Sequence, residues 1–169
     1  MRLNEPVVRA LLERLEAELP AVIAEINTDV PDDEEIEAPK ALFPIVPPPG
    51  LLVDYPAIGI RHLPSRLEDD TGSSATGVHE LAIIYFLVNT DPVLLGWQLV
   101  HYAQAISTVA LRGRFLGDAS GSAAGGGAWG VTYRNWLPGP TLGDSDEPEN
   151  VKTYLSYGAV VIVAKREEI

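Results

Sequence analysis

Three histidines are the first residues to consider for acid–base or metal chemistry. They are His62, His79 and His101, and none stands near a second metal ligand at a spacing that suits a metal ion. The His-Glu-x-x-His pattern of zinc peptidases is absent from the sequence. A lone histidine is weak support for a catalytic site. We therefore predict structural or surface roles for all three.

Two acidic runs could suggest calcium binding. The first holds Asp32, Asp33, Glu34 and Glu35, and the second spans 144–149. A calcium loop of the EF-hand type needs alternating acids, a central glycine and a terminal glutamate, and neither run has that order. Nothing singles out a carboxylate pair for acid–base catalysis. We interpret both runs as solvated loops whose like charges repel one another.

The glycine-rich segment 117–130 could suggest phosphate binding. It lacks the terminal Lys-Ser/Thr of a phosphate-binding loop, and it follows an expected helix rather than a strand. Ser120 and Ser122 do not form a Gly-x-Ser-x-Gly elbow. The chain has no cysteine, which excludes disulfides, thiolate metal ligands and cysteine nucleophiles. We expect no cofactor, no metal ion and no enzymatic activity.

Length and charge limit the class of protein further. The 169 residues suit one domain, which we expect to span 1–169. With 12 Lys and Arg against 24 Asp and Glu, the net charge is −12. Such a chain lacks the clustered positive charge that grips nucleic acid. No apolar run reaches the ~18 residues of a membrane helix, and the acidic N-terminal segment does not suit a signal peptide. We expect the chain to be made in the cytosol.

Two helices are expected to position the remaining elements. In 5–27, Val8, Leu15 and Leu19 recur at helical spacing, although Pro20 predicts a kink or break near Leu19. The second helix starts at Asp91-Pro92 and runs to about 112. Its core-facing stripe steps by four and three residues. The stripe consists of Leu95, Leu99, Tyr102, Ile106 and Val109.

The segment 28–50 is rich in acids and prolines. It holds six acids against the single Lys40, which predicts a long extended loop rather than a helix or a central strand. Apolar residues nevertheless gather at 41–46. Long loops are uncommon in compact domains unless they have a role. A partner surface is therefore one interpretation of 41–46, and packing against the core is the other.

The part of the chain from 51 to 165 is expected to form a sheet-and-helix core. Strands are predicted at 51–61, where Pro56 suggests an edge or bulge, and at 129–136 and 154–165. Residues 78–88 are apolar on both faces and predict a central strand covered on both sides. Loops are expected at 66–77, 117–130 and 137–150. The fold class is α+β: a mixed, mainly antiparallel sheet of about four to five strands with two main helices packed on it and long mobile loops.

Several linked segments give the chain a resemblance to a known family. They are YPAIGI at 55–60, the strand ending in Val88-Asn89, the helix segment WQLVHYAQAISTVAL at 97–111 and the strand LSYGAVVIVAKRE at 155–167. Their order after an N-terminal helix resembles the tail terminator proteins of long-tailed bacteriophages. It is similar, more loosely, to other small neck and tail-completion proteins of these phages.

The resemblance implies a structural virion protein in the tail or neck, assembled in the host cytoplasm. Such proteins form a homo-oligomeric ring, expected to be a hexamer, that caps the tail tube and stops its polymerisation. The implied partners are other copies of the chain, the tail tube protein and the head connector or stopper protein. Genomic DNA would pass through the channel without specific binding, and no membrane is involved.

Candidate residues for these contacts follow from residue type. Tryptophan is favoured at interfaces, and acidic loops that face the channel would repel DNA. The candidate assembly interface consists of Leu42, Phe43, Ile45, Val46, Trp97 and Trp129. The candidate channel-facing loop consists of Asp32, Asp33, Glu34 and Glu35. Core packing is the alternative interpretation of the apolar residues.

Two other functions stay open from sequence. A head-completion or stopper protein of the neck would also form a ring. A small ligand-binding domain or enzyme would instead carry a deep polar pocket between helix 91–112 and the sheet.

Overall fold

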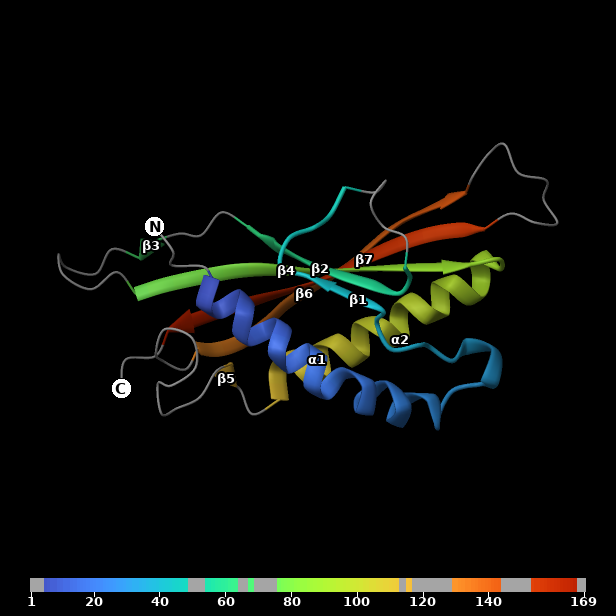
Figure 1. Cartoon of the computed structure of the whole chain (residues 1–169), viewed down its shortest axis with the longest axis horizontal. Helices are drawn as coiled ribbons and strands as arrows, with labels where there is room; N and C mark the ends of the chain where they lie inside the picture. Colours follow the sequence, from blue (N-terminus) through green and yellow to red (C-terminus); the bar gives the residue numbers. More distant parts are fainter. Residues whose placement is uncertain are drawn as a thin grey trace.

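Two long helices lie along one face of a β-sheet (Figure 1). The computed structural model describes residues 5–48, 54–63, 67–68, 76–112, 115–116, 129–143 and 153–166. The helices are α1 (Glu5–Asn27), the short 3-10 helix η1 (Asp32–Glu34) and α2 (Pro92–Leu111). The strands are β1 (Ala41–Phe43), β2 (Ala57–His62), β3 (Leu67–Glu68), β4 (Thr76–Asn89), β5 (Phe115–Leu116), β6 (Trp129–Gly143) and β7 (Tyr154–Arg166). This architecture confirms the predicted α+β class.

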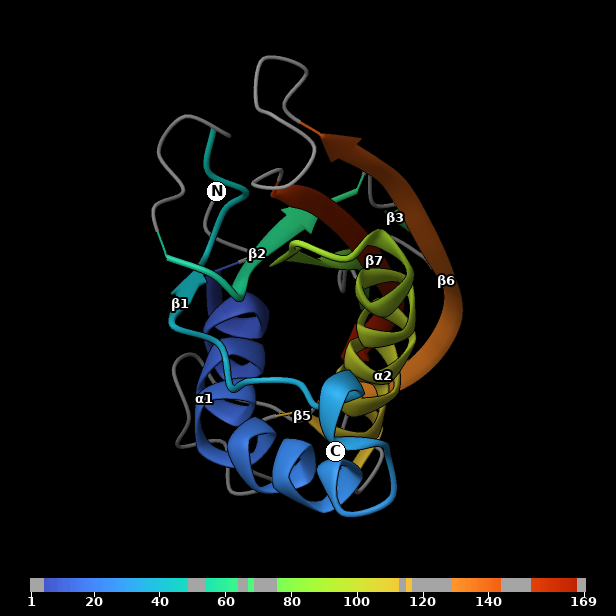
Figure 2. The ribbon, with the colours of Figure 1, turned by 90° about the vertical axis from the view of Figure 1, so that its right-hand side faces the viewer.

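The sheet is mixed and mainly antiparallel, as predicted. Its strand order is β1-β2-β4-β7-β6-β5, and β3 pairs with the start of β4. Among the strands that the structure describes, only the pairing of β1 with β2 is parallel. Figure 2 shows β6 curving around the side of α2, so that the sheet partly encloses this helix. The long strands β4, β7 and β6 therefore form the wall against which α2 packs.

The strand β4 separates the two faces of the sheet. Its odd-numbered residues face the helices, and Leu81, Ile83 and Tyr85 are fully buried there. Its even-numbered residues point to the opposite side, which we name the outer face. Phe86 is buried on the outer face, whereas Val88 is exposed. The expected central strand is confirmed, but among the described residues its outer face is not covered along its whole length.

The hydroxyl of Tyr85 connects three elements inside the molecule. It donates a hydrogen bond to the Leu99 carbonyl of α2 at 2.8 Å, and it accepts one from Trp136 Nε1 of β6 at 2.7 Å. The Tyr85 ring also stacks on Tyr102, with centroids 5.5 Å apart. Gly158 of β7 makes room for this arrangement, because a Cβ at that position would collide with the Tyr85 hydroxyl. The contact fixes the rotation of α2 relative to the sheet.

Helix α1 contains Pro20 and is nevertheless continuous from Glu5 to Asn27. The predicted helix over 5–27 is therefore confirmed, and of the two predicted effects of Pro20, a kink or a break, the break does not occur. Proline removes one backbone donor and clashes with the carbonyl four residues earlier, which bends a helix more often than it ends one when neighbouring residues are held. Leu19, Val22 and Ile23 are buried on either side of the exposed Pro20. Figure 2 shows the helix axis changing direction along its length.

The helix α2 begins where the sequence predicts. Asp91 is its N-cap, and the Oδ1 atom accepts hydrogen bonds from the amides of Val93 at 2.8 Å and Leu94 at 3.3 Å. The cap satisfies backbone donors that the first turn leaves free. The predicted core-facing stripe is confirmed, since all its members are buried. They are Leu95, Leu99, Tyr102, Ile106 and Val109.

Two strand predictions require correction. The strand β2 begins only at Ala57, after the cis Tyr55–Pro56 peptide, and it lies between β1 and β4 rather than at an edge. The strand β6 continues through 137–143, which the prolines had predicted to be a loop. Among the described residues, β5 pairs only with Trp129 and Gly130 of β6. No described strand pairs with Pro138 on the β5 side of β6, so a proline without an amide hydrogen breaks no hydrogen bond between strands there. In the predicted loop 66–77, residues 67–68 instead form β3 and residues 76–77 begin β4, because they pair with each other. The remaining parts of the three predicted loops, 69–75, 117–128 and 144–150, lie outside the described residues.

We predict that Gly158→Ala destabilises the fold by about 1–3 kcal/mol, because the added methyl group forces Tyr85 away from Leu99 and Trp136. Denaturant unfolding measures the change. Gly96→Ala is the matched control, since a Cβ there meets nothing within 4 Å. The control should be neutral or slightly stabilising, because alanine favours a helix over glycine by up to ~1 kcal/mol. Equal effects of the two substitutions would contradict the role of Gly158.

Candidate functional site

The acidic segment 32–37 is held against α1 and α2 by hydrogen bonds. Asn27, the last residue of α1, binds both backbone groups of Ile36: its Nδ2 donates to the Ile36 carbonyl at 2.8 Å, and its Oδ1 accepts from the Ile36 amide at 3.0 Å. The Ile36 side chain is buried in the main core. This two-bond contact replaces the water that would otherwise hydrogen-bond to this loop backbone. The segment is thus an ordered part of the helical layer.

The helix α2 holds the same segment from its other side. Gln98 Nε2 donates to the Glu35 carbonyl at 2.9 Å, and Gln98 Oε1 accepts from Asn89 Nδ2 at 2.9 Å. His101 Nε2 lies 3.1 Å from the Glu34 carboxylate, with both side chains mostly buried. Of the four candidate channel-facing residues, Glu34 is therefore partly withdrawn from solvent. The other three carboxylates are exposed: Asp32, Asp33 and Glu35.

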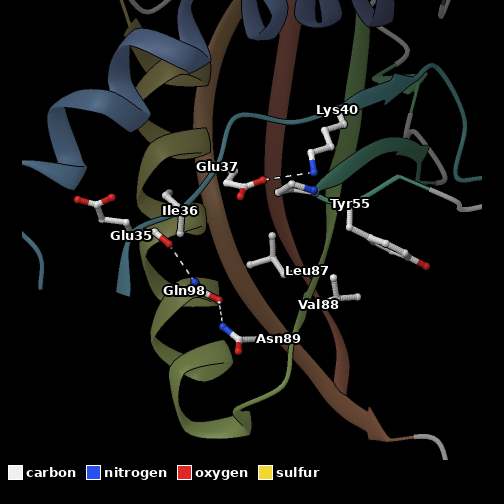
Figure 3. A pocket seen from close by; sticks show the side chains of 10 residues that line it. Glu35, Ile36, Glu37, Lys40, Tyr55, Leu87, Val88, Asn89 and Gln98 are labelled. Atoms are coloured by element: carbon white, nitrogen blue, oxygen red, sulfur yellow. Dashed lines mark hydrogen bonds and ion pairs between the residues drawn. The ribbon is translucent and has the colours of Figure 1, made fainter. Parts of the chain in front are cut away.

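A polar pocket of about 310 Å³ lies between α2, the end of β4 and the segment 35–40. Figure 3 shows Glu37 and Lys40 at one end of the pocket and Asn89 with Gln98 at the other. Glu37 and Lys40 form an exposed ion pair at 3.4 Å. Carboxylates beside amide groups suit a small polar molecule with hydrogen-bond donors. This pocket lies where the alternative ligand-binding function predicts one.

The apolar residues at 41–46 divide between two packing environments and solvent. Leu42 points to the helix side and packs against the main core. Phe43 and Val46 pack on the outer face with a small cluster around Ala57 and Phe86. Ile45 remains 67% exposed. The segment is thus folded onto the sheet, and among these four candidate interface residues Ile45 presents the most surface.

Gly59 explains how the segment after β1 can cross the sheet. A Cβ at Gly59 would lie 3.0 Å from both the Ile45 carbonyl and the Val46 Cα. The chain therefore passes directly over β2 at the one residue without a side chain. This crossing covers the outer face above β1 and β2.

Trp97 belongs to an exposed apolar row on α2. It is 51% exposed and lies between Val93, which is 68% exposed, and Val100, which is also exposed. We name these three residues the α2 stripe. Residue type identified Trp97 but not Val93 or Val100. A signal for them exists in the sequence, because 92–111 contains no Asp, Glu, Lys or Arg, and the solvent-facing side of a surface helix usually carries charged residues.

A second exposed apolar group lies on the outer face. It consists of Val88 of β4, Leu137 of β6 and Tyr157 of β7, and we name it the outer sheet patch. Leu137 is the most exposed of the three, at 52%. The patch could not be expected from the sequence, because the prolines at 137–150 predicted a loop. The candidate interface residue Trp129 begins β6 opposite Arg166, and its side chain lies outside what the structure describes.

The three histidines make two kinds of side-chain contact. His101 pairs with Glu34, whereas His62 and His79 meet edge to face with centroids 5.5 Å apart. Among the described residues, neither His62 Nε2 nor His79 Nδ1 has a hydrogen-bond partner. Burial lowers the pKa of His79, and the nearby His62 lowers it further. His62 also lines a groove of about 570 Å³ between α1 and the segment 44–45.

Comparisons with known proteins give limited information. No protein-family model and no curated protein matches the chain. One similar solved structure is a chain from the virion of a native gene transfer agent particle, with a TM-score of 0.48 and 17% sequence identity. The alignment covers 96% of this chain and 95% of that one. A likeness at this level establishes neither a family nor a function.

Within the described ranges, no three His, Cys, Asp or Glu side chains group closely enough to hold a metal ion. In the same part of the chain, neither helix is both long and apolar enough to cross a bilayer.

We predict that the free energy of unfolding decreases as the pH falls from about 7 to about 5.5. The folded-state pKa of His79 lies below its ordinary value of about 6.5. The unfolded chain therefore takes up this proton first, and protonation favours unfolding in this window. Urea unfolding at a series of pH values measures the slope. In His79→Gln the slope should be smaller, and an unchanged slope would show that His79 does not cause it.

We predict that Asn27→Ala destabilises the protein by about 1–3 kcal/mol, because it removes both partners of the Ile36 backbone. Hydrogen exchange of the Ile36 amide should become faster at the same time. Asp33→Ala is the control, since this side chain is exposed in the same segment. If the two substitutions have the same effect on exchange, Asn27 does not hold the segment in place.

Proposed function

We propose that this chain is a structural, non-enzymatic subunit of a phage-like virion and acts as its tail terminator. In this role, copies of the chain form a ring that caps the tail tube, stops its polymerisation and offers a surface to the head connector. The observation that carries the proposal is the exposed, charge-free α2 stripe on a chain of net charge −12. Exposed apolar groups of this kind mark protein interaction sites.

The α2 stripe supports assembly because the helix that carries it contains no Asp, Glu, Lys or Arg. The chain as a whole is 21% charged, yet the 20 residues of α2 include none of the four charged types. Charged residues are depleted and tryptophan is enriched at the centre of protein interfaces. Leaving Val93 and Trp97 in water has an unfavourable hydration free energy that a neighbouring subunit would remove. A subunit of a larger assembly explains the stripe better than a lone monomer does.

The order of elements gives further support. The resemblance to tail terminators implied a mixed sheet with helices packed on it, and the fold has a mixed sheet with two long helices on one face. The N-terminal helix, the capped α2 and the long strand β7 all occur at the positions on which the resemblance depends. The resemblance itself remains the source of the terminator role, the hexameric ring and the partners.

The exposed carboxylates of Asp32, Asp33 and Glu35 suit a channel through which DNA passes. The segment that carries them is held by Asn27 and Gln98, so its charges keep a fixed position in each subunit. Repeated around a ring, these charges would repel the phosphate backbone and prevent binding. Genomic DNA would then slide without adhering to the protein.

Two other functions compete with the terminator. A head-completion or stopper protein of the neck would use the same surfaces in a ring at another position. The polar pocket between α2 and β4 favours the second competitor, a small ligand-binding protein. Its volume is at the lower end of the ~300–1,000 Å³ typical of ligand sites. A compact monomer that binds a small polar molecule would support this competitor.

The test is the mass of the purified protein over a concentration series, with negative-stain images, alone and with polymerising tail tubes of the same virion. We expect a ring of about six subunits with an open centre, and tubes that carry this ring at one end and stop growing. A ring that binds the head side but never the tube would favour the stopper. A protein that stays monomeric both alone and with tubes would overturn the proposed function.

A further inference from the structure

We infer that the α2 stripe of one copy of this chain docks on the outer sheet patch of the next copy, head to tail. The inference rests on the proposed function, because it identifies the two surfaces that close the ring. It follows from the position, exposure and charge of the two surfaces.

The α2 stripe has the form of a docking ridge. Val93, Trp97 and Val100 are spaced by four and three residues, so they lie in one row along the helix. The Trp97 indole is itself 51% exposed. Tryptophan is enriched among the residues that supply most of the binding energy at protein interfaces.

The outer sheet patch is an apolar surface built on paired strands. Leu137 lies opposite Ala159, which lies opposite Ile84. Tyr157 lies opposite Phe86, and their rings are 6.1 Å apart. Leu155 lies opposite Val88 in the same way. Three successive rungs of the outer face are therefore apolar across β4 and β7.

Gly139 holds the tyrosine of this patch in place. A Cβ at Gly139 would collide with the backbone and ring of Tyr157, so the two residues are in close contact where β6 bulges. Farther along the sheet, the first charged pair on the outer face is Arg134 with Glu80. This ion pair forms one polar limit of the patch.

The two surfaces lie on opposite sides of the molecule. The α2 stripe points away from the sheet, because Leu95 and Leu99 on the other side of α2 are buried against it. The outer sheet patch points away from α2, because it belongs to the opposite face of β4, β6 and β7. One copy therefore cannot cover its own stripe with its own patch. A two-fold dimer would cover only one kind of surface, whereas a head-to-tail contact covers both.

Charge limits where a second copy of the chain can dock. Each copy carries a net charge of −12, so most surfaces of two copies repel one another. Contact between copies is least opposed where both sides lack charge, and the stripe and the patch meet this condition. A basic partner would be drawn instead to exposed carboxylates such as Asp32 and Asp33. The pairing of stripe with patch is thus the self-contact that the charge distribution permits.

Cross-linking tests the contact directly, since the chain has no cysteine of its own. We propose the double variant Trp97→Cys with Leu137→Cys, assembled as the full chain and treated with a short bis-maleimide. The expected product is a ladder of covalent oligomers that ends at the size of the ring. Each single variant alone should give no oligomer, and an equal mixture of the two should give dimers only. Circular dichroism confirms that every variant is folded.

Other outcomes separate the inference from the proposed function. Dimers formed by Trp97→Cys alone would overturn the inference in favour of a two-fold contact. Rings that form without cross-links in the double variant would overturn the inference and leave the tail terminator standing. A ladder that continues beyond any ring size would support the contact and overturn the closed ring.

A substitution series gives a second, independent measurement. Trp97→Glu and Leu137→Glu should each weaken self-association about 30-fold or more, because each places a charge at the centre of the contact. Ala24→Glu is the matched control, since it adds the same charge to an exposed position of α1 that belongs to neither the stripe nor the patch. If the control weakens association as much as Trp97→Glu does, net charge rather than the stripe controls assembly.

Discussion

The contact between the Tyr85 hydroxyl and α2 is the constraint on which the rest of the surface depends. The hydroxyl bonds to Leu99 and Trp136, and Gly158 leaves the space for it. These bonds set the rotation of α2 about its own axis. Once Leu99 faces the sheet, the helical period places Val93 and Trp97 on the solvent side. An interior hydrogen bond thus determines which part of the exterior is apolar.

The surface is divided into acidic and charge-free regions, and each has a structural cause. The acidic segment keeps its position because Asn27, Gln98 and His101 bind it at Ile36, Glu35 and Glu34. The charge-free regions occur where α2 and the paired strands carry apolar residues on both of their sides. When copies associate through the charge-free regions, the acidic segment stays in water. Its charges are then spared the free-energy penalty of desolvation. The acidic segment therefore favours solubility, and the charge-free regions favour association between copies.

The polar pocket and the apolar surfaces lead to different functions, and the fold favours the surfaces. The pocket is bordered by the side-chain amides that hold the acidic segment, so Gln98 already uses its amide oxygen and nitrogen within the protein. The stripe and the patch have no comparable structural use, since solvent meets Trp97 and Leu137 directly. Residues without an internal role are the stronger indication of an external partner.

Local patterns in the sequence determined α2 with its Asp91 cap, the central strand β4 and the α+β class, because helical spacing, capping and apolar runs act over a few residues. Tertiary contacts decided the rest. Pro20 bends α1 without ending it because buried neighbours hold the helix, and Pro138 is tolerated because β5, the described neighbour on the other side of β6, pairs only with Trp129 and Gly130. The candidate site depended most on tertiary structure. Residue type identifies Trp97 as a candidate, but only the packing of Leu99 under Tyr85 decides that Trp97 faces outward, and only strand register brings Leu137 onto the outer face with Tyr157.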